Sequence, residues 1–176
     1  MNQSRGGWRL ILLAAVLILP LPYLLLIHAR IPQDNGYHVF ADVRTCLGIN
    51  NFGNVASNMA FLMVGTWGGW WCALRMRGCA RLVWGIFFAS VAMVFAGSAY
   101  YHAAPDDDQL VWDRLPTTLA FTGLVGAVVT EHIGLQWERK LLYPALVLGV
   151  ASVLWWQSAD DLRVYVWAQG ELLLAI

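Results

Sequence analysis

Residues 82–101 read LVWGIFFASVAMVFAGSAYY, a run of twenty amino acids without a charged side chain. A helix of that length spans ~30 Å, the thickness of the hydrocarbon core of a bilayer. Similar uncharged runs occupy residues 10–27, 55–74, 115–130 and 141–159, and a sixth apolar run, over residues 164–176, contains one charged residue, Glu171. The sequence therefore predicts an all-α, polytopic transmembrane helix bundle of about six helices, of which the last is incomplete.

The composition supports a membrane protein. Hydrophobic residues make up 59% of the 176 residues and charged residues only 12%, whereas soluble domains carry roughly a quarter charged residues. The formal net charge is zero, so no nucleic-acid partner is expected, because such a partner requires a basic face. We expect one membrane-embedded domain over residues 1–176, with core helices in residues 55–176 and an additional helix in residues 1–30.

The additional N-terminal helix has two interpretations. Arg5 and Arg9 precede an apolar run, as in a secretory signal, but the run is long and contains Pro20 and Pro22. These features favour an uncleaved anchor. Lys and Arg placement favours a cytoplasmic N-terminus, because seven of the eleven basic residues then lie on the inner side: Arg5, Arg9, Arg75, Arg77, Arg81, Arg139 and Lys140.

Three polar residues near one predicted membrane face could carry chemistry. Ser98 and His102 are four residues apart, so their side chains share one face of a helix. The following loop returns Asp113 to the same side, just before Pro116, which is expected to open the next helix. Histidine can bind a metal, aspartate can accept a proton from water, and serine can donate to an oxyanion.

Each of these residues also has a simpler interpretation. Asp113 could be an acid in the first turn of a helix, where the helix dipole favours it. Ser98 could bond a backbone carbonyl or a neighbouring helix, and His102 could lie at the membrane interface. The three acids in residues 106–108 are predicted to form a solvated loop.

A second polar group lies beside the run at residues 55–74. Its members are Asp42, Arg44, Asn50, Asn51, Asn54, Ser57 and Asn58. Intramembrane polar side chains usually face other helices, so we expect Asn54 and Asn58 to join helices together. The alternative is a calcium site that includes Asp42, although such sites normally use more carboxylates.

Two stretches of the sequence resemble the alkaline ceramidase family, in particular bacterial alkaline phytoceramidases, within the CREST superfamily of membrane hydrolases. The first comprises YHVFADVR at residues 37–44 and GINNFGNVASN at residues 48–58. The second comprises GSAYYH at residues 97–102 and WDRLP at residues 112–116. A weaker likeness covers DLRVY at residues 161–165 and Gln169.

The resemblance implies a seven-helix fold in which zinc, held by three histidines, activates water to cleave ceramide into a sphingoid base and a fatty acid. His102 matches the first zinc ligand. Asp113 would orient or deprotonate the water, and Ser98 would stabilise the site or the oxyanion. A location in the bacterial inner membrane, with the site toward the outer face and a membrane lipid as substrate, follows from this interpretation.

This sequence departs from the family pattern at the other zinc ligands. The family takes two of them from a His-x-x-x-His pair on its last helix, and that pair is absent from this chain. His132 is expected at the opposite membrane face, while His38 is expected on the same side as His102. Asn51 stands where the family's calcium pattern has a glutamate, which leaves Asp42 as its remaining candidate ligand.

The sequence thus predicts a zinc-dependent intramembrane amide hydrolase of the ceramidase type that lacks the C-terminal helices of the family. The hydrolase could be inactive in this truncated form. A rival prediction is a non-enzymatic membrane protein, either receptor-like, as the progestin and adipoQ receptors are, or one that packs with partner helices. The missing histidine pair is the feature that favours the rival.

Overall fold

The computed structural model describes residues 15, 19–77 and 80–174, which are helical apart from loops and one isolated β-bridge. Its elements are α2 (Pro20–Ile27), η1 (Asn35–His38), α3 (Phe52–Ser57), α4 (Met59–Arg75), α5 (Arg81–Ala103), α6 (Asp107–His132), η2 (Leu135–Trp137), α7 (Glu138–Ala159) and α8 (Arg163–Leu174). The predicted all-α class is confirmed for these residues. Residues 10–14, 16–18, 175 and 176 of the predicted first and sixth helices lie outside the described part.

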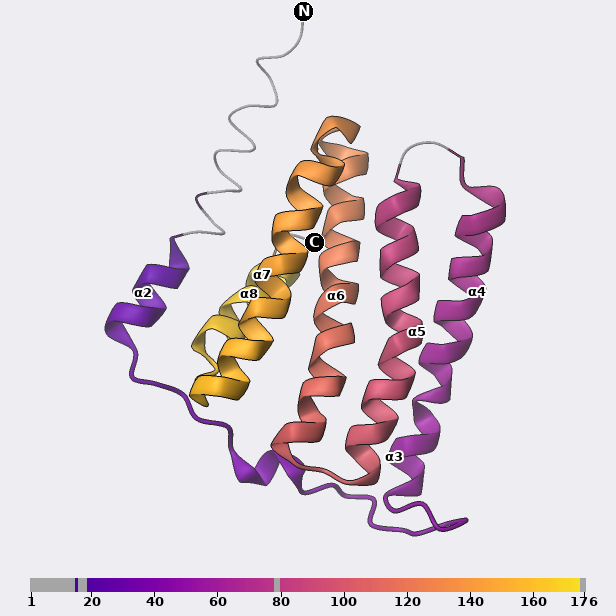
Figure 1. Cartoon of the computed structure of the whole chain (residues 1–176), viewed down its shortest axis with the longest axis vertical. Coiled ribbons are helices and arrows are strands. Elements are labelled where there is room, and N and C mark those ends of the chain that lie inside the picture. The colour runs from indigo at the N-terminus through magenta and orange to yellow at the C-terminus, as the bar shows by residue number, and fades with distance from the viewer. Residues whose placement is uncertain (1–14, 16–18, 78–79, 175–176) are drawn as a thin grey trace, which may run out of the picture.

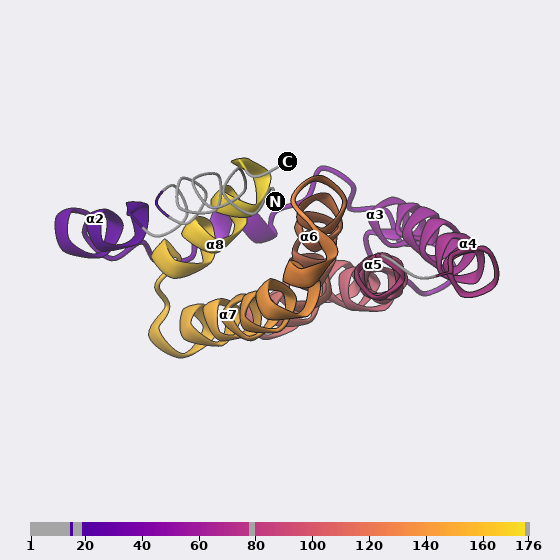
Figure 2. The ribbon, with the colours of Figure 1, turned by 90° about the horizontal axis from the view of Figure 1, so that it is seen from above.

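Helices α4 to α7 stand side by side as a row of long helices (Figure 1). Seen from above, α8 and α2 lie together on one side of this row, with α8 next to α7 (Figure 2). A long connection from α2 to α3, residues 28–51, crosses the lower end of the row in Figure 1. We call this connection the strap. It runs past the end of the bundle at which α5 finishes and α6 begins.

Two clusters of buried side chains join α5, α6 and α7. The cluster nearer the strap consists of Tyr101, Leu110, Val111, Val153 and Trp156. The cluster toward the other end consists of Ala80, Val83, Ala127 and Leu142. Because the same three helices meet in both clusters, burial of apolar surface holds them together along their length.

The predicted helix over residues 55–74 is divided at Asn58 into α3 and α4. The buried side chain of Asn58 donates through Nδ2 to the carbonyl of Asn54 (2.9 Å), and Ser57 Oγ donates to the same carbonyl (2.8 Å). Such local bonds compete with the regular helical pattern. The expectation that Asn58 bonds another helix is therefore wrong for these contacts, which stay within one turn.

Helix α6 begins at Asp107, well before the predicted start at residue 115. The carboxylate of Asp106 accepts a hydrogen bond from the backbone N–H of Gln109 (2.8 Å) and so caps the helix, and Asp107 and Asp108 occupy its first turn. The three acids are exposed, as predicted, but the prediction that they form a loop is wrong, because they cap and begin a helix. Pro116, expected at the helix start, lies inside α6, so Asp113 belongs to the helix as well.

Two segments among the described residues are long and apolar enough to cross a membrane, namely Arg81–Ala103 and Leu135–Ala159. Helix α4 is apolar, but its 17 residues span only about 26 Å. Helix α6 carries four charged side chains in its first eight residues and Glu131 near its end, which lowers its hydropathy. By length and composition, two of the predicted transmembrane helices therefore qualify as membrane spans.

Candidate functional site

The predicted site residues lie at the end of α5 and in the second turn of α6. His102 is in the last turn of α5, and its backbone carbonyl accepts a hydrogen bond from Asn51 Nδ2 of the strap (2.8 Å). Its ring packs against Phe40, also of the strap, with centroids 4.6 Å apart. The strap therefore fixes both the backbone and the ring of His102.

One nitrogen of His102 is buried without a partner. Nδ1 has no hydrogen-bond partner among the described residues and is shielded from solvent. A buried polar atom normally finds a partner, because leaving it unpaired costs about 1–3 kcal/mol. The carboxylate of Asp113 lies within electrostatic reach of the ring. His102 thus has a buried nitrogen without a partner at the end of α5.

Ser98 and Asp113 lie on either side of a close contact between α5 and α6. A Cβ placed on Gly97 would overlap the carbonyl oxygen of Trp112 and would lie 3.3 Å from the backbone nitrogen of Asp113. Only glycine allows the two backbones to approach this far. Ser98 is buried and Asp113 is half-buried beside this contact. The structure therefore brings Ser98, His102 and Asp113 to one junction, although Asp113 comes from within α6 and not from a loop.

The other histidines do not join His102. His38 lies on the same side, as expected, but Nδ1 meets the hydroxyl of Tyr101 (3.0 Å) and Nε2 meets the carboxylate of Asp107 (3.2 Å). Both of its ring nitrogens are therefore engaged. His132 ends α6, about 29 Å from Asp113 along the helix axis, and its Nδ1 pairs with the carbonyl of Val128 (3.0 Å).

Asp42, the candidate calcium ligand, already has partners within the strap and α3. Its carboxylate accepts from Arg44 Nε (2.5 Å) and from the backbone N–H of Gly53 (2.6 Å). The hydrogen bond from Arg44 lowers the pKa of Asp42, although desolvation opposes the shift. The carboxylate of Asp42 therefore shapes the turn into α3, and the Arg44 guanidinium stands where a cation would approach.

Metal binding can be tested against the side chains at hand. Zinc in a catalytic site normally takes three protein ligands. The unpartnered Nδ1 of His102 suits one ligand position, yet the described residues contain no group of three His, Cys, Asp or Glu side chains placed to hold a metal ion. By themselves, the described residues do not fit a zinc site.

Sequence reasoning missed Arg114, which is the most deeply placed charge near the site. Its side chain is buried, with 6% of the residue exposed, and its guanidinium carbon lies 3.9 Å from the ring centroid of Trp156 and 4.6 Å from that of Tyr165. Nη2 donates to Gln33 Oε1 of the strap (2.8 Å). A charge next to Asp113 at the start of an uncharged run was the available signal, because such charges usually face a bundle interior.

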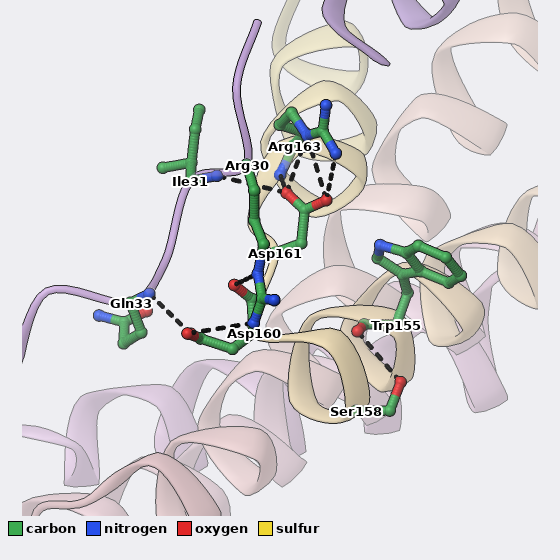
Figure 3. Close-up of polar contacts among 8 residues, drawn as sticks. All are labelled: Arg30, Ile31, Gln33, Trp155, Ser158, Asp160, Asp161 and Arg163. Carbon is green, nitrogen blue, oxygen red and sulfur yellow. Dashed lines mark hydrogen bonds and ion pairs between the residues drawn. The ribbon is translucent and has the colours of Figure 1, made fainter. Parts of the chain in front are cut away.

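Asp161 and Arg163 belong to the stretch 161–165 that weakly resembles the ceramidase family. They connect the strap to the corner before α8 (Figure 3), and we call this pair of residues the latch. Arg163 holds Asp161 through Nε and Nη2 (3.0 and 2.7 Å), and its Nη1 donates to the carbonyls of Leu25 and His28. Asp161 also accepts from the backbone N–H of Ile31 (3.5 Å). Hydrogen bonding from Arg163 lowers the pKa of Asp161 to about 2, against the effect of burial. The latch fixes where the strap begins.

Gln169 belongs to the same side of the bundle. Its Nε2 donates to Thr118 Oγ1 (2.5 Å), so α8 is bonded to α6 one turn beyond Arg114.

No family model, curated protein or solved structure matches the chain.

Proposed function

We propose that this protein is a membrane-embedded hydrolase of the ceramidase type, which cleaves the amide bond of a lipid at the junction of α5 and α6. The observation that carries the proposal is the buried, unpartnered Nδ1 of His102, one turn after Ser98 and within electrostatic reach of Asp113. A buried nitrogen without a partner requires an explanation, and a binding or catalytic role is one such explanation.

The membrane setting is supported by the surface of α4. Large apolar side chains on this helix are exposed to an extent that water would disfavour, and Trp67 is 69% exposed. The others are Met59, Phe61, Met63, Val64, Trp70, Trp71 and Leu74. We propose an inner-membrane protein in which α4, α6 and α8 pack with the two spanning segments, with the site toward the outer face.

The proposed reaction assigns one task to each side chain. The carboxylate of Asp113 accepts a proton from a water molecule whose oxygen attacks the amide carbon. The hydroxyl of Ser98 donates to the oxygen that becomes negatively charged. When the C–N bond breaks, Asp113 returns the proton to the amine, so a fatty acid and a free amine leave. Nδ1 of His102 orients the water.

Zinc is part of the proposal only through His102, since the described residues offer no complete ligand set. Its presence requires a direct measurement. Elemental analysis of the purified full chain tests this part: zinc that is present in wild type and lost in His102→Ala would make His102 a ligand. Equal zinc content in both proteins would remove His102 from the ligand set.

The activity test uses the full chain in lipid nanodiscs with a fluorescent ceramide. Wild type is expected to release labelled fatty acid, and His102→Ala is expected to lose about a hundredfold or more of that rate. His132→Ala is the matched control, because His132 is an exposed histidine at the far end of α6. Equal rates in wild type and His102→Ala would contradict the proposal.

A second candidate is a non-enzymatic membrane protein, either receptor-like or one that packs with partner helices. It is favoured by the lack of a three-ligand group among the described residues and by the engagement of both nitrogens of His38. A folded wild-type protein that holds no zinc and releases no fatty acid would favour this candidate over the hydrolase.

A further inference from the structure

Arg114 is a buried cation without an anionic partner among the described residues. Arg114 takes part in none of the ion pairs that these residues form, although only 6% of its surface is exposed. Nη1 is shielded from solvent and has no hydrogen-bond partner. Burying a charge is costly unless the charge is paired and its donors are satisfied.

Aromatic rings and one amide hold the guanidinium in place. Trp156 of α7 and Tyr165 of α8 lie under its central carbon, and the ring of Tyr37 is 5.8 Å away. Cation–π contacts of this kind stabilise a cation but accept no hydrogen bond at the edge of the guanidinium. Gln33 satisfies Nη2 with a neutral oxygen. Nη1 therefore lacks an acceptor but is covered, so an incoming acceptor has to displace part of this cover.

Two of the groups around Arg114 come from the strap. Gln33 is half-buried and Tyr37 is 54% exposed, so they form the outermost cover of the guanidinium. Asp113, the next residue along α6, interacts with Arg114 electrostatically. A ligand that reaches Nη1 from the strap side therefore lies beside the proposed reaction site.

We propose that Arg114 binds the carboxylate of an anionic amide lipid, so that an N-acyl amino acid is preferred as substrate over a neutral ceramide. This inference rests on the proposed function for the acyl amide, and Arg114 supplies the headgroup preference. A carboxylate is planar and can lie in the plane of a guanidinium edge, which is the usual geometry of this pair. A neutral headgroup would offer Nη1 no charged acceptor, while Asp107 and Asp113 interact with Arg114 electrostatically without forming an ion pair with it.

The test compares two lipids that differ in one group, by calorimetric binding to the full chain in neutral-lipid nanodiscs. N-palmitoylglycine carries a carboxylate, and N-palmitoylethanolamine carries a hydroxyl in its place. Wild type is expected to bind the acid about tenfold or more tightly than the alcohol, as one charge-assisted hydrogen bond allows. Arg114→Gln is expected to bind both lipids equally, by weakening the acid alone.

A second variant keeps the test valid if Arg114→Gln does not fold. Gln33→Glu places an internal carboxylate at the atom that already contacts Nη2, so it is expected to abolish the preference for the acid while the fold remains. Arg44→Gln is the control, because it removes an exposed positive charge on the same side of the molecule and is expected to keep the preference. Equal binding of both lipids by wild type would overturn the proposal.

Two further results separate this inference from the proposed function. Palmitate carries its carboxylate directly on the acyl chain, as a reaction product would, and binding as tight as that of N-palmitoylglycine would contradict the headgroup assignment. Selective binding of N-palmitoylglycine without its hydrolysis supports the anion site while the hydrolase proposal fails. Hydrolysis of ceramide with equal binding of both test lipids leaves the hydrolase standing and overturns the anion site.

Discussion

Gly97 of α5 lies directly against the carbonyl oxygen of Trp112 in α6, so that any Cβ at residue 97 would overlap this oxygen. Pro116 follows four residues after Trp112 and has no N–H, so the carbonyl of Trp112 has no helical partner at that position. The Trp112 carbonyl, which lacks a helical hydrogen bond, therefore faces Gly97, which lacks a side chain. This contact sets the spacing of the helices that carry Ser98 and Asp113.

Gly97→Ala is expected to destabilise the protein by about 1–3 kcal/mol, because overpacking forces α5 and α6 apart. Thermal unfolding in detergent measures the loss as a lower midpoint. Gly85→Ala is the matched control in the same helix, since a Cβ there meets nothing within 4 Å. Equal midpoints for the two variants would show that the backbones do not meet as closely as described.

Tyr101→Phe is expected to loosen the strap. The hydroxyl of Tyr101 meets His38 Nδ1, and loss of one such bond costs about 1 kcal/mol. Hydrogen–deuterium exchange should then be faster in strap peptides around residues 35–40. Tyr100→Phe, an exposed neighbour in the same helix, should leave the exchange unchanged. Identical exchange in both variants would rule out the Tyr101 contact as an anchor of the strap.

Asp106→Ala is expected to fray the first turn of α6, because it removes the N-cap at a cost of about 0.5–2 kcal/mol. Amide exchange at residues 107–111 should accelerate. Asp108→Ala changes an exposed acid in the same turn without removing the cap, and a smaller effect is expected from the helix dipole alone. A larger effect from Asp108 would place the cap elsewhere.

The latch predicts a pH-dependent stability. The pKa of Asp161 is about 2 in the folded protein, below its ordinary value of ~3.9 in an unfolded chain. Its contribution is therefore complete above about pH 5 and is lost as the pH falls toward 2. Asp161→Asn should lower the unfolding midpoint at pH 7, and the difference from wild type should shrink between pH 5 and pH 2.

The exposed neighbour Asp160 provides the comparison for that titration. Its carboxylate meets Arg30 at 3.5 Å and accepts from the backbone N–H of Gln33 at 2.9 Å. Exposed ion pairs contribute little to stability, so Asp160→Asn should have the smaller effect at pH 7. A pH-independent difference between wild type and Asp161→Asn would contradict the assignment of the latch to a charged Asp161.

The apolar runs predicted the helices well because helix length and hydropathy are local properties. The predicted run at residues 82–101 corresponds to α5 within two residues at each end. The start of α6 was missed because its charges ended the uncharged run, although Asp106 followed by Gln109 is a typical cap pattern. Hydropathy alone therefore underestimates a helix that begins with acids.

The site itself was predictable only in part. The spacing of Ser98 and His102 follows from helix periodicity, and Asp113 lies within electrostatic reach of the His102 ring. The neighbours of Arg114 come from the strap, α7 and α8, far away in the sequence. No periodic pattern reveals such contacts, because they depend on how the strap crosses the bundle.

Amide hydrolysis by Asp113→Asn is the measurement that tests the central claim most directly, since the substitution keeps the shape of the side chain and removes its basicity. The full chain in nanodiscs should lose about a hundredfold or more in kcat/KM, whereas Asp108→Asn, an exposed acid of the same helix, should retain the wild-type value. Unchanged kcat/KM in Asp113→Asn would contradict the catalytic role of the α5–α6 junction.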